Sequence, residues 1–157
     1  MSKVLIIIDV QKGFAEKKTM HVVDFIRSLL QKERFDVIVQ SRWENYMGSK
    51  YETDLGYDSV GNSAETELLI PEHSDHVITR TCYSCMCDKL RRLINKDDDI
   101  YVVGLETDAC VLATLFDLWD EGYKFHVYRK GVGTNAKNLE GPALALIERQ
   151  FGKKVLI

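Results

Sequence analysis

Residues 100–122 read IYVVGLETDACVLATLFDLWDEG, and this stretch decides the fold. It begins with the β-branched and aromatic run Ile100 to Val103, which is typical of a strand buried on both faces. Apolar residues then recur with the period of a helix, and Gly122 is placed to end it. These apolar residues are Leu112, Leu115, Phe116 and Trp119. The segment Gly104 to Asp108 is therefore the turn from strand to helix, and Cys110 begins the helix.

Cys110 lies in the first turn of this predicted helix. Unpaired backbone N–H groups and the positive end of the helix dipole favour a thiolate there, which would make Cys110 a nucleophile. The alternative is that Cys110 is a small buried residue that fills the junction between strand and helix. This stretch alone leaves both interpretations open, because a catalytic thiol needs partner groups.

The rest of the chain repeats the alternation of strand and helix. Runs of apolar residues predict five further strands, at Val4 to Ile8, Asp36 to Gln40, His76 to Thr79, Lys124 to Tyr128 and Lys153 to Leu156. Helical periodicity predicts helices at His21 to Gln31, Asp88 to Asn95 and Leu139 to Phe151. Strands that alternate with helices form crossover units, so we predict an α/β fold with helices on both faces of a mainly parallel, six-stranded sheet.

Length and charge limit the class of protein. A chain of 157 residues with 45% hydrophobic residues suits a single domain over residues 1–157. The net charge of -3 gives no attraction to nucleic acid or to an anionic membrane. The apolar start is too short for a signal peptide, and no apolar run approaches the length of a membrane span. We therefore expect a cytoplasmic protein whose four cysteines are reduced.

The segment Trp43 to Pro71 interrupts the alternation. It has little helical periodicity and contains several glycines and aromatic residues, and connections of this length are usually functional covers or disordered. Because of the aromatic residues, we expect an ordered segment, which either covers a ligand site or contacts a partner. We take Trp43, with Phe14 after the first strand and Tyr83 after the third, as candidates for the wall of a substrate pocket.

Three chemically active side chains follow predicted strands. Asp9 ends the first strand, Arg80 follows the third and Cys110 follows the fourth. Ligands bind outside the carboxyl ends of the strands in a parallel α/β sheet, so these side chains are expected at one edge. A carboxylate can take the proton of a thiol, and a cation lowers the pKa of both groups. These are the parts that acyl transfer requires.

Three segments resemble the signatures of the isochorismatase-like cysteine hydrolases, a superfamily that includes nicotinamidases and N-carbamoylsarcosine amidases. They read VLIIIDVQKGF, HVITRTCYSCM and VVGLETDACVLATLFDLWDEGY. The resemblance implies a Rossmann-like, three-layer α/β/α fold and a catalytic Asp, Lys and Cys. Asp9 then corresponds to the base and Cys110 to the nucleophile. It also implies a cis peptide between Leu105 and Glu106, and an oxyanion hole formed by the backbone N–H groups of Glu106 and Cys110.

Arg80 occupies the position where the resemblance implies a lysine. An arginine keeps the positive charge but cannot give up a proton, and a bidentate pair with Asp9 would occupy that carboxylate. The first expectation is hydrolysis of a C–N bond in a small amide or carbamoyl compound through a thioester at Cys110. The alternative is a catalytically impaired member that binds a small ligand or a protein. The resemblance also implies a homo-oligomer.

No metal or other cofactor is expected. Nicotinamidases of this superfamily bind zinc through one Asp and two His after the second strand, but the corresponding residues 40–60 contain no histidine. The cysteines Cys82, Cys85 and Cys87 form C-x-x-C-x-C, which lacks the second cysteine pair of most zinc sites. Redox pairing of Cys82 with Cys85, or of either with Cys110, is the better alternative for them. The G-x-G-x-x-G motif of dinucleotide-binding proteins is absent after the first strand.

Overall fold

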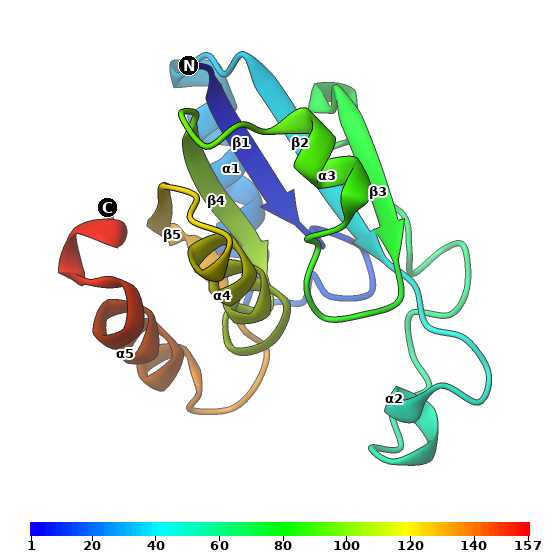
Figure 1. Cartoon of the computed structure of the whole chain (residues 1–157). Helices are drawn as coiled ribbons and strands as arrows, with labels where there is room; N and C mark the ends of the chain where they lie inside the picture. The colour runs from blue at the N-terminus through cyan, green and yellow to red at the C-terminus, as the bar shows by residue number, and fades with distance from the viewer.

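The computed structural model describes residues 1–157, and a parallel five-stranded sheet forms its centre (Figure 1). The strand order is β3-β2-β1-β4-β5, and every neighbouring pair is parallel. The strands are β1 (Lys3–Ile8), β2 (Val37–Trp43), β3 (His76–Arg80), β4 (Asp99–Leu105) and β5 (Phe125–Gly133). The order reverses at β1, so the carboxyl ends of β1, β2 and β4 lie where such sheets bind ligands.

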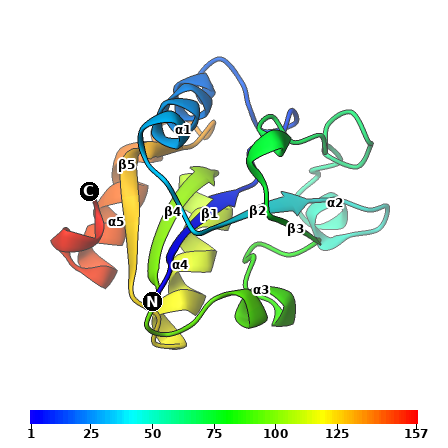
Figure 2. The same ribbon diagram turned by 90° about the horizontal axis from the view of Figure 1, so that it is seen from above.

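Helices cover both faces of the sheet. Figure 2 shows α1 (Met20–Lys32) alone on one face, with α3 (Asp88–Leu93) and α4 (Leu112–Asp120) on the other. The fifth helix, α5 (Glu140–Phe151), packs beside α4. Four single turns complete the structure: α2 (Lys50–Thr53), the 3₁₀ turns η1 (Pro71–His73) and η3 (Lys153–Val155), and the π-helical turn η2 (Thr107–Val111). None of the helices combines the length and apolar composition that a membrane span requires.

The pattern of side chains in β1 explains the layers. Residues Val4 to Ile8 are all fully buried. Val4, Ile6 and Ile8 belong to the core shared with α3, α4 and α5, whereas Leu5 and Ile7 belong to the core beneath α1. Alternate side chains of a strand point to opposite faces, so a continuous apolar run requires cover on both. The predicted α/β fold with helices on both faces is confirmed.

The predicted sixth strand is wrong. Residues Lys153 to Val155 form the turn η3, and only Leu156 makes a single bridge, to Val127 of β5. The chain reverses at Gly152, whose φ is +92°, and Val155 N–H donates to the Gly152 carbonyl. Few residues remain after this turn, so the chain adds one bridge to the edge of the sheet instead of a strand.

The buried face of α4 also differs from the prediction. Leu115 is fully buried as expected, but Phe116 is 39% exposed and Trp119 is 50% exposed. Their rings pack on Phe151 of α5, at centroid distances of 5.1 and 5.5 Å. The helix itself begins at Leu112, one turn after Thr107, because the π-helical turn η2 precedes it. That turn shifts the buried face to Thr114, Leu115 and Leu118.

Candidate functional site

Asp9 is the centre of a buried polar cluster at the carboxyl ends of β1, β2 and β3. Its side chain is fully buried, and its φ of +50° turns the chain directly after β1. The Arg80 Nη2 group donates to Asp9 Oδ2 at 2.8 Å, and the Ser41 hydroxyl donates to Asp9 Oδ1 at 2.7 Å. Both carboxylate oxygens therefore have a partner, as a buried charge requires.

The pair between Arg80 and Asp9 is made by one hydrogen bond. Arg80 uses Nη2, while its Nε and Nη1 groups are buried without a partner in the protein. Burial lowers the pKa of Arg80, but the charge of Asp9 and its hydrogen bond with Arg80 raise it, and the pKa is raised overall. The guanidinium therefore stays charged and retains N–H groups for a further acceptor.

Gly104 brings β4 close enough to β1 to align their ends. A Cβ atom at this position would lie 2.1 Å from the Ile8 carbonyl oxygen, and the φ of Gly104 is +134°. Only glycine fits this contact and this backbone conformation. The residue directly after Ile8 is Asp9, and the turn that follows β4 carries Cys110. The close approach therefore positions the two ends beside each other.

Cys110 lies in η2 and is 6% exposed. Burial raises its pKa well above 9.0, the charge and hydrogen bonding of Asp9 raise it further, and Arg80 lowers it. The prediction that the start of a helix favours the thiolate is wrong here, because burial dominates over the dipole of a single turn. Thr114, the third residue of α4, donates to the Cys110 carbonyl at 2.8 Å and fixes this backbone.

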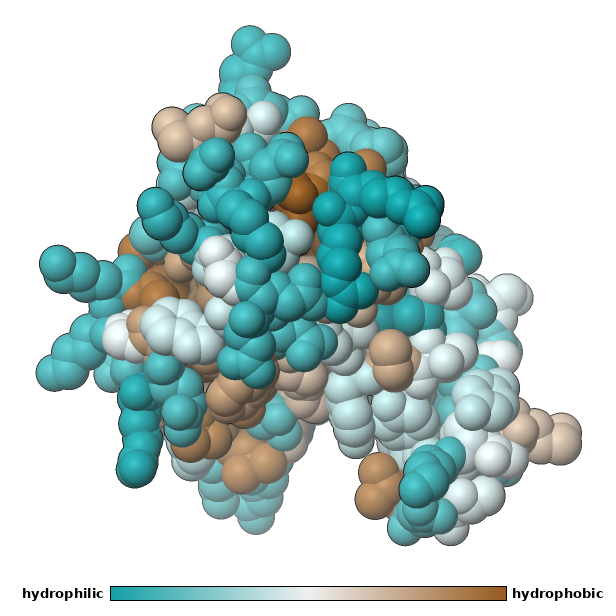
Figure 3. All heavy atoms as spheres, viewed as in Figure 1, coloured by the Kyte–Doolittle hydropathy of each residue, from teal (hydrophilic) through white to brown (hydrophobic).

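A cavity of about 420 Å³ lies above Cys110. Figure 3 shows the molecule hollowed between the part that carries α2 and the part that carries α4 and α5. The predicted pocket residues Phe14, Trp43 and Tyr83 all line this cavity, together with Glu106 and Cys110. Asp9 and Arg80 are not among the residues that line it. Cys110 therefore borders both the cavity and the buried ion pair.

Aromatic rings form one continuous wall of this cavity. Trp43 contacts Tyr51 at 5.0 Å between centroids, Phe14 at 5.8 Å and Tyr57 at 6.1 Å, and Tyr51 contacts Tyr83 at 5.1 Å. The segment Trp43 to Pro71 thus supplies part of a ligand cavity, in agreement with an ordered cover. Tyr51 and Tyr57 were not singled out from the sequence, although they belong to the aromatic residues that predicted this cover.

Asn135 joins the turn after β4 to the loop after β1. Its side chain amide donates to Glu106 Oε1 and to the Phe14 carbonyl, both at 2.7 Å, and its backbone N–H donates to Glu106 Oε2 at 2.6 Å. The peptide bond between Leu105 and Glu106 is cis, as the resemblance implies. Burial raises the pKa of Glu106, whereas the hydrogen bonds from Thr134 and Asn135 lower it. No sequence pattern singles out Asn135, because its role depends on contacts with two loops that are distant in the chain.

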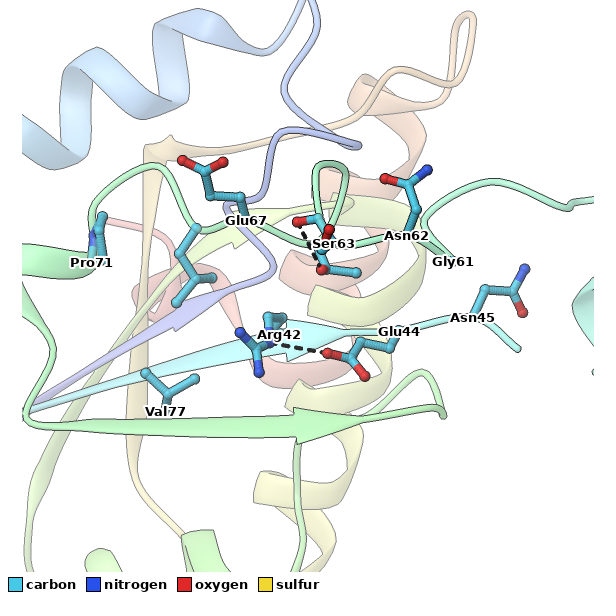
Figure 4. Close-up of a pocket in the computed structure, with 11 residues that line it drawn as sticks. Arg42, Glu44, Asn45, Gly61, Asn62, Ser63, Glu67, Pro71 and Val77 are labelled. Carbon is cyan, nitrogen blue, oxygen red and sulfur yellow. Dashed lines mark hydrogen bonds and ion pairs between the residues drawn. The ribbon is translucent and has the colours of Figure 1, made fainter. Parts of the chain in front are cut away.

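A second cavity, of about 730 Å³, lies on the other side of β2 (Figure 4). Its main charged side chains, Arg42 and Glu44, already pair with each other at 3.3 Å between Nε and Oε1. The segment that carries Asn62 and Ser63 closes it from above. No cysteine lines it, so we place the candidate functional site at the smaller cavity, which Cys110 borders.

The remaining cysteines form no disulfide, since all four thiols are free. Cys85 is buried, and burial raises its pKa to about 12. Nowhere in the chain do three or more His, Cys, Asp or Glu side chains come together to hold a metal ion. The zinc set of nicotinamidases therefore does not fit the residues present.

The isochorismatase domain model matches residues 3–156. The chain belongs to this family. Among curated proteins, the secreted isochorismatase effector Isc1 of Phytophthora sojae is 26% identical over 162 residues, which cover 96% of this chain and 70% of that protein. The resemblance seen in the three sequence segments is confirmed at the level of the isochorismatase family.

Solved structures of the isochorismatase fold superimpose on nearly the whole chain. Nicotinamidase PncA from Bacillus subtilis matches with a TM-score of 0.79 at 21% identity, and 100% of each chain is covered. N-carbamoylsarcosine amidase from Thermoplasma acidophilum matches with a TM-score of 0.76 at 20% identity, covering 97% of this chain and 94% of that one. At this identity the likeness shows the shared fold, and the chemistry must be argued from the site.

Proposed function

We propose that this isochorismatase family member is a cysteine-dependent hydrolase that cleaves the C–N bond of a small amide or carbamoyl compound. One observation carries the proposal: Cys110 borders the cavity on one side and the buried pair of Asp9 and Arg80 on the other. A substrate in the cavity could reach the sulfur, while Asp9 and Arg80 are buried beneath the surface.

In the proposed mechanism, Asp9 accepts the proton of Cys110 as the sulfur attacks the carbonyl carbon. The backbone N–H groups of Glu106 and Cys110 stabilise the negative oxygen that forms. Asp9 then returns the proton to the leaving nitrogen, the C–N bond breaks and a thioester remains. Water, deprotonated by Asp9, hydrolyses the thioester and restores the thiol.

Arg80 acts in this mechanism through its charge. It cannot exchange a proton at neutral pH, but its unpaired Nε and Nη1 groups can stabilise the thiolate that forms during the reaction. Because Arg80 holds Asp9 by one hydrogen bond, the carboxylate keeps acceptor capacity for the proton of the thiol.

The second candidate function is a catalytically impaired member that binds a small ligand or a protein through the same cavity. The observation that favours it is Arg80 itself, because the resemblance implies a lysine at this position. A lysine could exchange a proton with Cys110 and Asp9, whereas the guanidinium stays protonated and paired.

Release of ammonia from a panel of small amides tests the two functions, with Cys110→Ala as the matched inactive control. The hydrolase proposal expects turnover by the wild type, none by Cys110→Ala, and an acyl adduct on Cys110 in acid-quenched samples by mass spectrometry. If the wild type is inactive and Arg80→Lys gains turnover, the second function is correct. Activity that survives in Cys110→Ala would contradict the thioester mechanism.

We further propose a cytoplasmic location, as the four free thiols suit a reducing compartment. The relative from Phytophthora sojae is described as secreted. Fractionation of the source cells with an antibody against the chain distinguishes the two locations, because a secreted protein would accumulate in the medium.

A further inference from the structure

The charges around the cavity are of one sign. Of the fifteen residues that line it, Glu16, Glu106 and Asp108 are acidic, and none is Lys, Arg or His. The nearest cation, Arg80, is buried behind Cys110 and paired with Asp9, so this pair adds no net charge. A ligand in the cavity therefore meets three carboxylates that no basic residue of its wall neutralises.

The other feature of the wall is its aromatic surface. Phe14, Trp43, Tyr51, Tyr57 and Tyr83 all line the cavity, and their rings contact one another. The faces of such rings carry negative partial charge and attract ammonium groups within about 6 Å of a ring centroid. Aromatic rings combined with carboxylates favour a cation over a neutral group of the same shape.

The carboxylate of Asp108 lacks a partner in the protein. Asp108 lines the cavity from the turn η2, two residues before Cys110 in the chain. No hydrogen bond or ion pair engages its side chain, and its Oδ1 atom is buried without a donor. An unpaired carboxylate costs free energy, so this side chain favours a ligand that brings a positively charged group.

The acidic residues of the cavity also act on its aromatic wall, at Tyr57. Burial is the main cause that raises the pKa of Tyr57 to about 12, and the charges of Glu106 and Glu16 raise it further. Glu106 accepts two hydrogen bonds from Asn135, which spread part of its charge. Asp108, with one oxygen unpaired, is therefore the carboxylate best placed to hold a cation.

We propose that the substrate of this site is a small amide or carbamoyl compound that carries a positive charge, as a protonated or quaternary amine, close to the reacting carbonyl. This inference rests on the proposed function for the position of the carbonyl next to Cys110. The aromatic wall and Asp108 bind the cation, and this contact presents the carbonyl carbon to the sulfur. Anionic amides are excluded by the same three carboxylates.

Two amides of nearly equal shape, one cationic and one neutral, show whether the charge of a ligand affects its binding. Trimethylammonioacetamide carries a quaternary nitrogen, and tert-butylacetamide has carbon at the same position. Their Kd values for the full chain, measured by titration calorimetry on Cys110→Ala to prevent turnover, should differ about tenfold in favour of the cation. Malonamate, an amide of similar size with a carboxylate, should bind more weakly than either.

Substitutions in the wall test the source of this preference. Asp108→Asn should reduce the tenfold ratio to about threefold or less, because it removes the carboxylate with the unpaired oxygen. Asp120→Asn on the exposed end of α4 removes the same charge away from the cavity and should leave the ratio unchanged.

The outcomes separate this inference from the proposed function. Tighter binding of the cationic amide without its hydrolysis by the wild type supports the inference and contradicts the hydrolase. Equal turnover of both amides supports the hydrolase and overturns the inference. The inference is also overturned if the two amides bind equally, if malonamate binds most tightly, or if neither amide binds.

Discussion

Cys110 is a thiol whose surroundings oppose its ionisation at rest. Burial and the carboxylate of Asp9 raise its pKa well above 9.0, and only Arg80 lowers it. A thiol of this kind becomes a nucleophile when its proton is removed during the attack itself, which is the role we propose for Asp9. The resting site is then protected from alkylation and oxidation, since these reactions need a thiolate.

Alkylation by iodoacetamide tests this protonation state. Cys110 should react slowly at pH 7 and faster as the pH rises through 9 and above, because the raised pKa delays thiolate formation. Asp9→Asn should speed the labelling at pH 7, since it removes one cause of the raised pKa. The same variant should lose amide hydrolysis by a factor of roughly 10² to 10⁴, because it removes the base.

Peptide mass spectrometry measures the labelling of each cysteine in one sample. The exposed Cys82 is the internal reference for reagent activity. Two results would contradict the role of Asp9 in raising the pKa of Cys110. In the first, Cys110 is labelled at pH 7 as fast as Cys82. In the second, Cys110 is labelled more slowly in Asp9→Asn than in the wild type.

Arg80 should matter for stability as well as for chemistry. Arg80→Met leaves the fully buried Asp9 without its cation, and loss of one partner of a buried pair costs about 3 to 5 kcal/mol. Asp9→Asn combined with Arg80→Met removes both charges and should recover most of this loss. Urea denaturation followed by circular dichroism measures the free energy of unfolding; a double variant no more stable than Arg80→Met would contradict the explanation.

At the scale of elements, the site depends on how closely β4 approaches β1. The strands pair from Lys3 with Asp99 to Ile8 with Gly104, and the last pair lacks a side chain on the β4 side. That contact sets the end of β4, and the turn η2 with Cys110 follows directly. A change in this one contact should therefore move Cys110 relative to Asp9.

Gly104→Ala tests this dependence. The added Cβ would lie 2.1 Å from the Ile8 carbonyl oxygen at a φ of +134°, so overpacking and backbone strain together should cost about 2 to 6 kcal/mol. Gly141→Ala in α5, where no atom lies within 4 Å of the added Cβ, is the matched control and should be neutral or stabilising. Equal unfolding free energies for the two variants would argue against a close contact at Gly104.

The residues at the ends of strands were predictable from the sequence, but the residues that contact them from neighbouring strands and loops were not. The apolar run before Asp9 and the T-D-A-C turn after β4 placed Asp9 and Cys110 at one edge, as found. Ser41 was missed because its role depends on the register between β1 and β2, which pairs it with Ile8. Asn135 was missed because the predicted fifth strand ends at Tyr128, whereas β5 continues to Gly133, two residues before Asn135. Asp108 lies in the predicted turn between strand and helix, where its position in the sequence does not reveal that it lines the cavity. Burial at Phe116 and Trp119 was overpredicted because the π-helical turn changed the phase of α4.

At the scale of the whole molecule, α4 carries two exposed aromatic side chains outside the cavity, Phe116 and Trp119. Phe116 and Trp119 contact the same ring, Phe151, and stay 39% and 50% exposed. We keep the prediction that the chain forms a homo-oligomer, and expect this surface to contribute. Trp119→Lys should then lower the mass measured by light scattering in solution. Lys124→Glu, a charge change outside this surface, is the control, and a monomeric wild type would contradict the prediction.

The two buried thiols should also make the free energy of unfolding of the whole chain fall at high pH. Burial raises the pKa of Cys85 to about 12 and that of Cys110 well above 9.0. Below about pH 7 both thiols are protonated in the folded and unfolded chain and add no pH dependence, because the ordinary pKa of a cysteine is about 8.5. As the pH rises further, the unfolded chain loses protons that the folded chain retains, so the free energy of unfolding should fall by up to about 1.4 kcal/mol per pH unit for each thiol.

Denaturation between pH 8 and pH 9 measures this slope, because unfolded cysteines titrate there with their ordinary pKa of about 8.5, whereas unfolded tyrosines titrate near pH 10. The variant with both Cys85→Ala and Cys110→Ala should lose the slope, whatever its stability at pH 7. Cys82→Ala removes an exposed thiol and leaves both buried ones, so it should keep the slope. A slope that persists in the double variant would assign this pH dependence to other groups, and burial of the thiols would then not set it.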